Sequence, residues 1–100
     1  MIKHIVLFKL LDNAEGKTKE ENAKFIKEKL EELNGVVPGL IKLEVGINFT
    51  VSDTASDVVV NSEFESKEAL EGYIVHPQHK EIAEYIAKVR SERRVVDYEV

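Results

Sequence analysis

Two kinds of hydrophobic pattern alternate along this chain of 100 residues. Branched apolar residues, or apolar positions two residues apart, predict strands at residues 2–10, 41–49, 57–65 and 93–99. Apolar positions three and four residues apart predict a helix after Thr18 and further helical structure after Ser66. Thr18 with Glu21 matches a capping box, and Ser66 is a good helix N-cap. Pro77 divides the second helical region in two, because the residue before a proline avoids the helical conformation.

The order of these elements is β-α-β-β-α-β, with the second helix broken. This order predicts an α+β, ferredoxin-like fold, in which a four-stranded antiparallel sheet carries the helices on one face. The length and the absence of a linker or repeat predict one domain over residues 1–100.

Alternation along each strand sorts its residues into two faces of the sheet. The face predicted to lie under the helices carries the apolar majority: Ile2, His4, Val6, Phe8, Leu10, Ile41, Leu43, Val45, Ile47, Phe49, Val58, Val60, Ser62, Phe64, Val96 and Tyr98. The other face is charged at its ends but aliphatic at Ile5, Leu7, Val59 and Val95. An exposed aliphatic patch usually marks an interface, so these four residues predict a homodimer packed sheet to sheet. The alternative is a monomer with scattered aliphatic residues on that face.

Three titratable side chains are predicted to point into the layer between sheet and helices: His4, Tyr73 and His79. One interpretation is a small pocket for an apolar ligand, walled by Val6, Phe8, Val58, Val60, Ile82 and Ile86. Acid–base chemistry there would use His79 as the general base, with Tyr73 and His4 orienting or polarising a carbonyl group. The alternative is that the three groups are satisfied by one another, by backbone carbonyls or by water.

Composition excludes several classes of site. The chain has no cysteine, and its net charge of −5 argues against nucleic-acid binding. His76 and His79 are three residues apart, but Pro77 separates them and no HExxH pattern is present, so neither a metal nor a cofactor is expected. No stretch resembles a signal peptide or a membrane span, and we expect a cytoplasmic protein with no membrane partner.

Three stretches resemble the stress-responsive A/B barrel (Dabb) family: MIKHIVLFKL, the run FESKEALEGYIVHPQH from Phe64 to His79, and VVDYE. The resemblance implies a dimeric α+β barrel formed by two sheets packed face to face. Plant members are linked to stress, and some assemble into rings. A few members are cofactor-free polyketide cyclases whose pocket is similar to the one that His4, Tyr73 and His79 would form. Those cyclases carry a further histidine near position 58, where this chain has Val58.

The sequence therefore supports a homodimer of this type that binds a small apolar molecule between sheet and helices. Two alternatives stay open: a cofactor-free, cyclase-like acid–base enzyme, and a non-catalytic stress-response protein. A cofactor-independent monooxygenase of the related dimeric α+β type is a further possibility, and it rests on fold analogy alone.

Overall fold

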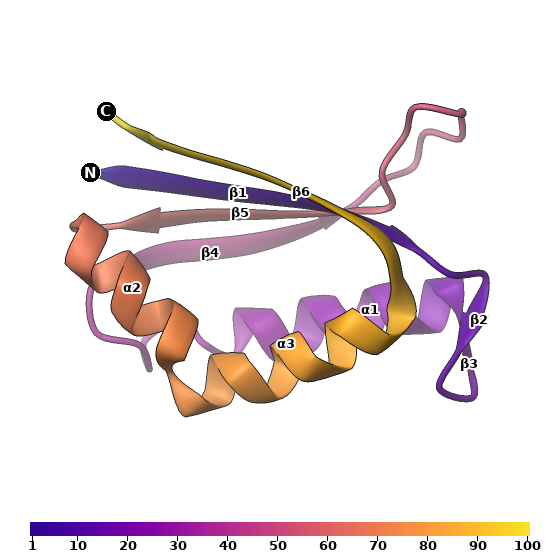
Figure 1. Ribbon diagram of the computed structural model, residues 1–100, viewed down its shortest axis with the longest axis horizontal. Coiled ribbons are helices and arrows are strands. Elements are labelled where there is room, and N and C mark those ends of the chain that lie inside the picture. Colours follow the sequence, from indigo (N-terminus) through magenta and orange to yellow (C-terminus); the bar gives the residue numbers. More distant parts are fainter.

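In the computed structural model, which describes residues 1–100, one antiparallel sheet carries all three helices on a single face (Figure 1). The elements are β1 (Ile2–Leu10), β2 (Asn13–Ala14), β3 (Lys17–Thr18), α1 (Lys19–Glu31), β4 (Leu40–Ile47), β5 (Val58–Phe64), α2 (Lys67–Val75), α3 (Pro77–Val89) and β6 (Arg90–Glu99). The strand order β4-β5-β1-β6 confirms the predicted ferredoxin-like fold. None of the helices is both long and apolar enough to span a membrane.

Local signals in the sequence determine where the helices begin. The Thr18 hydroxyl accepts a hydrogen bond from the Glu21 backbone at 3.2 Å, and the Glu21 carboxylate accepts one from the Thr18 backbone at 2.9 Å, which confirms the capping box. Ser66 caps α2 through the Ala69 backbone at 3.1 Å. His76 Nδ1 caps α3 by accepting from the Gln78 backbone at 3.2 Å, and Pro77 is the first residue of α3.

The core fills the space between the sheet and the helices. Its largest fully buried side chains include Tyr73, Phe64 and Ile26. Two buried polar side chains are held by hydrogen bonds: the Ser62 hydroxyl donates to the His4 carbonyl at 2.8 Å, and the Asn22 amide donates to the Ala14 carbonyl at 3.1 Å. No fully buried side-chain polar atom lacks a partner, as a stable interior requires.

The prediction for β4 is wrong at its first residues, and its last residues are less buried than predicted. A register irregularity between Leu40 and Lys42 places Leu40 against the core and leaves Ile41 half-exposed. Such a bulge inserts one residue and reverses the side to which the preceding side chain points. Ile47 lies on the predicted face, opposite Val58, but is 44% exposed, and Phe49 lies beyond the end of the strand with 94% of its surface accessible.

The face prediction for β6 is also wrong. Val6 pairs with Val95 and His4 with Asp97, and directly opposed residues of antiparallel strands share a face of the sheet. Val95 therefore lies on the helix side, whereas Val96 and Tyr98 point away from the helices. Adjacent valines leave the alternation ambiguous. The helices cover this edge strand only partly, so its inward face does not have to be apolar.

The outer face consequently gains apolar area compared with the prediction. Ile5, Leu7 and Val59 share it with Val96 and Tyr98, which are 57% and 45% exposed. We call these five residues the outer patch.

α3 runs directly into β6. The helix ends at Val89, the strand begins at Arg90, and no loop residue separates them. The Val89 side chain is fully buried, and its carbonyl accepts from the Leu11 backbone at 2.9 Å, so the junction is fixed on both sides.

Two glycines with the same backbone conformation lie in the segment between α1 and β4. They provide a test of how tightly this segment packs against α2. Gly35 and Gly39 both have φ of 79°, but a Cβ at Gly39 would lie 2.5 Å from the Ala69 Cβ, whereas a Cβ at Gly35 meets nothing within 4 Å. Gly35→Ala should lower the free energy of unfolding by about 1 kcal/mol, the cost of a left-handed alanine. Gly39→Ala should cost roughly 1–3 kcal/mol more because of overpacking. Urea unfolding measures both. Equal losses would mean that α2 moves aside without cost.

Candidate functional site

A cavity of about 150 Å³ lies between the sheet and the helices, and residues from six elements line it. They are His4, Val6, Phe8, Leu30, Val60, Tyr73, His79, Ala83, Ile86, Arg90 and Arg93. The structure thus brings together His4, Tyr73 and His79: the His4 and Tyr73 ring centres are 6.1 Å apart, and those of Tyr73 and His79 are 4.2 Å apart.

The predicted walls are only partly those of this cavity. Val6, Phe8, Val60 and Ile86 line it. Val58 does not line it. This residue is the first of β5, is fully buried, and pairs with Phe8 and Ile47. Ile82 lies one helical turn before Ile86 and lines a different hollow, between α1 and α3.

His4 forms the shortest polar contact in the cavity wall. Its Nδ1 lies 2.5 Å from Asp97 Oδ1, because the two residues face each other across the β1–β6 pair. The ring is buried, whereas the Asp97 side chain is 47% exposed and keeps part of its hydration. A carboxylate can only accept, so Nδ1 carries a proton, and in the neutral form of the ring Nε2 has a free lone pair.

Three polar atoms of the cavity have no partner within the protein. The hydrogen bonds of His4 and His79 use only their Nδ1 atoms, and the Tyr73 hydroxyl forms none. Since every fully buried side-chain polar atom is paired, these two Nε2 atoms and this hydroxyl must touch open space. The three side chains therefore do not satisfy one another, and their unpaired atoms are available to a ligand.

Burial sets the protonation of two of these groups. It lowers the pKa of His79, against the raising effect of the Ile74 carbonyl that His79 Nδ1 contacts at 3.2 Å, and repulsion from the nearby Arg93 adds to the lowering. Burial also raises the pKa of Tyr73 well above its ordinary value. At neutral pH the cavity therefore offers a neutral imidazole at His79 and a protonated hydroxyl at Tyr73.

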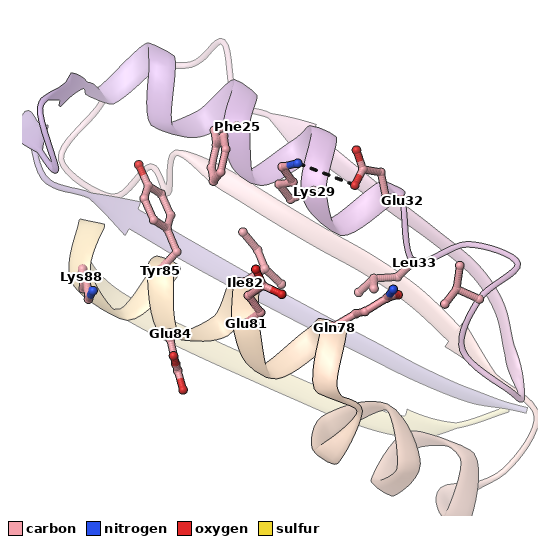
Figure 2. Close-up of a pocket in the computed structure, with 11 residues that line it drawn as sticks. Phe25, Lys29, Glu32, Leu33, Gln78, Glu81, Ile82, Glu84, Tyr85 and Lys88 are labelled. Carbon is pink, nitrogen blue, oxygen red and sulfur yellow. Dashed lines mark ion pairs between the residues drawn. The ribbon is translucent and has the colours of Figure 1, made fainter.

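A larger hollow of about 500 Å³ lies between α1 and α3, where Phe25 and Tyr85 face each other with ring centres 4.7 Å apart (Figure 2). Two of its polar groups are already engaged: the Tyr85 hydroxyl donates to Asn22 at 2.5 Å, and Lys29 pairs with Glu32 at 3.9 Å. The groove contains no histidine and its only tyrosine hydroxyl is engaged, so the smaller cavity, where two histidines and a tyrosine meet, is the candidate site.

Asp97, Arg90 and Arg93 belong to the site but do not stand out in the sequence pattern. All three come from β6, for which the alternation predicts the opposite faces and therefore places Asp97 and Arg93 away from the helices. Only the pairing of β6 with β1 reveals them, because the alternation of β6 alone does not distinguish its faces.

Residues 2–100 match the model of the family described as Stress responsive A/B Barrel Domain (Dabb). This chain belongs to the Dabb family. The predicted resemblance is therefore confirmed over nearly the whole chain. None of the curated proteins is similar enough in sequence to count as a relative.

Solved structures resemble this Dabb protein over almost their full length. A dimeric ferredoxin-like protein of unknown function from Bacteroides fragilis is 29% identical, with a TM-score of 0.77 and coverage of 99% of this chain and 95% of that one. A dimeric ferredoxin-like protein of unknown function from Jannaschia sp. CCS1 is 26% identical, with a TM-score of 0.76 and coverage of 99% and 98%. A protein from Arabidopsis thaliana, 24% identical, has a TM-score of 0.82 and coverage of 100% and 95%.

The lowered pKa of His79 predicts a pH-dependent stability. The unfolded state binds a proton near pH 6.5, whereas the folded state does so only at lower pH, so the fold loses stability as pH falls below about 6.5. His79→Gln removes this contribution. Urea unfolding between pH 8 and pH 5 should show wild type losing stability relative to the variant as the solution is acidified. Parallel curves would contradict the assigned burial effect.

Proposed function

We propose that this Dabb protein binds a small carbonyl compound in the cavity and moves a proton on it without a cofactor. One observation carries the proposal: His4 Nδ1 lies 2.5 Å from Asp97 Oδ1, which leaves Nε2 without a partner at the cavity. A cavity of about 150 Å³ is the size that holds a benzene molecule, so we expect a ligand of roughly six to eight non-hydrogen atoms.

In the proposed reaction, His4 Nε2 removes a proton from the carbon next to the carbonyl group. Asp97 stabilises the resulting imidazolium, as a carboxylate does when it orients a catalytic histidine. The Tyr73 hydroxyl, kept protonated by burial, donates to the carbonyl oxygen as negative charge develops there. His79 has no carboxylate partner, so we assign it to ligand orientation and assign the role of base to His4.

Binding without turnover is the second candidate function. Aliphatic and aromatic side chains, including Val6, Phe8, Val60 and Ile86, form most of the cavity wall. Such a wall favours a small apolar molecule whether or not chemistry follows.

We also propose that the protein is a homodimer joined through the outer patch. The relatives from Bacteroides fragilis and Jannaschia sp. are described as dimeric. In this chain the outer patch lies on the sheet face that no helix covers (Figure 1). Packing two such faces together would remove its apolar area from water, which favours association.

Exchange of the α-protons of cyclohexanone in D2O, followed by proton NMR, tests the proposed chemistry. His4→Gln should slow the protein-dependent exchange by about 10²-fold or more, the usual contribution of a general base, and Asp97→Asn should also slow it. His76→Asn is the matched control, because it keeps a helix cap and its side chain does not line the cavity. Unchanged exchange in His4→Gln would disprove the role of His4. Binding of cyclohexanone without exchange would favour the second candidate.

Two neighbouring valines test the dimer. Val95 and Val96 are 44% and 57% exposed but lie on opposite faces of β6. Val96→Glu should convert the dimer to a monomer, because a charge would be buried in the interface, whereas Val95→Glu should leave it dimeric. Light scattering after size-exclusion chromatography measures the mass. Dissociation by Val95→Glu alone would show that the interface uses the other face.

A further inference from the structure

Two arginines of β6 line the cavity without a carboxylate partner. Arg90 and Arg93 both contribute to its wall, and neither takes part in any of the ion pairs of the structure. The neighbouring Arg94 differs: it pairs with Glu92 at 3.6 Å and lies on the outer face, opposite Leu7. Unpaired arginines at a cavity are notable in a chain with a net charge of −5.

The charges of the cavity are separated along β6. Asp97 lies opposite His4, and Arg93 lies opposite Phe8 on the same face. Arg93 and Asp97 are four positions apart along the strand, which corresponds to about 13 Å between their Cα atoms at 3.3 Å per residue. His4, with Asp97 behind it, thus lies toward one end of the cavity, and the unpaired arginines lie toward the other end. The Arg93 side chain is exposed but lies close enough to His79 for its charge to contribute to lowering the pKa of His79.

We propose that the ligand is a short oxo acid, whose carboxylate is bound by Arg90 and Arg93 while its ketone group lies at Tyr73 and His4. This rests on the proposed function of the same cavity and adds the substrate class. A guanidinium group matches a carboxylate with parallel, charge-assisted hydrogen bonds. An oxo acid of six to eight non-hydrogen atoms also fits the cavity volume.

The proton transfer balances without any further reactant. The C–H bond next to the ketone breaks, and its proton moves to His4 Nε2. The electron pair forms the carbon–carbon double bond of the enolate, and the negative charge on its oxygen is met by the Tyr73 hydroxyl. Return of a solvent-derived proton or deuteron from His4 regenerates the oxo acid. Arg90 and Arg93 hold the carboxylate throughout and determine specificity, whereas the proton passes through His4.

The test compares pyruvate with pyruvamide, which have the same shape and size but differ in charge. Methyl-proton exchange in D2O is measured by NMR for wild type, Arg93→Gln and Arg94→Gln, and binding of each probe is followed through the His79 ring signals. Wild type should prefer pyruvate by about tenfold or more, since hydrogen bonds to charged groups are the stronger class. Arg93→Gln should abolish most of this preference, because it should weaken the response to pyruvate far more than the response to pyruvamide. Arg94→Gln, which loses the same charge, should keep the preference for pyruvate.

The outcomes separate this inference from the proposed function. Equal binding and exchange of pyruvate and pyruvamide in wild type would overturn the oxo-acid inference. Equal effects of Arg93→Gln and Arg94→Gln would also overturn it. In either case, exchange of cyclohexanone would still support the proposed proton transfer. If wild type binds pyruvate preferentially and Arg93→Gln abolishes this preference, the oxo-acid inference is supported even when no probe is exchanged. Only the proposed proton transfer by His4 would then fail.

Discussion

The pairing of β1 with β6 is the interaction on which the rest of this molecule depends. It joins the first and last strands of the fold side by side, and its register places Asp97 beside His4 and Arg93 beside Phe8. Because side chains alternate strictly along a strand, a slip of one residue would turn every side chain of β6 to the other face. Val96 and Tyr98 would then face the helices, the outer patch would lose its apolar contribution from β6, and His4 would lose its carboxylate.

The parts of the structure that depend on neighbouring residues could be predicted from the sequence. Thr18 and Glu21 form their capping box within one turn of α1, and Pro77 interrupts the helices through its own ring. The meeting of His4, Tyr73 and His79 was also predictable, because each belongs to a long, clear apolar pattern that determines which way it points.

The parts that depend on pairing between distant strands could not be predicted. The bulge at Leu40 changes the register of β4 by a single residue and leaves no sign in the alternation. The adjacent valines 95 and 96 fit either face equally well, and the choice is made by hydrogen bonds to β1, more than 80 positions earlier in the chain. Asp97 and Arg93 were missed for the same reason.

The cavity places polar side chains in a layer of the core that is otherwise apolar, but the energetic cost is limited. Two histidines and a tyrosine occupy a layer that aliphatic residues would fill more favourably, and burying polar groups without partners is costly. The structure reduces this cost, because Asp97 remains partly hydrated while it holds His4, and the unpaired atoms face open space. Local departures of this kind are expected where function competes with packing.

The direct junction of α3 and β6 limits how the length of this chain can change during evolution. An insertion or deletion of one residue beside Val89 would have no loop to absorb it, so it would rotate α3 by about 100° or reverse the faces of β6. Either change would separate His79 from Tyr73, or Asp97 from His4. The segment at 48–57, between β4 and β5, projects beyond the sheet (Figure 1) and does not line the cavity, so its length is free to vary. Related chains that keep the cavity residues should therefore differ in length in the segment between β4 and β5, and agree in length at the junction of α3 and β6.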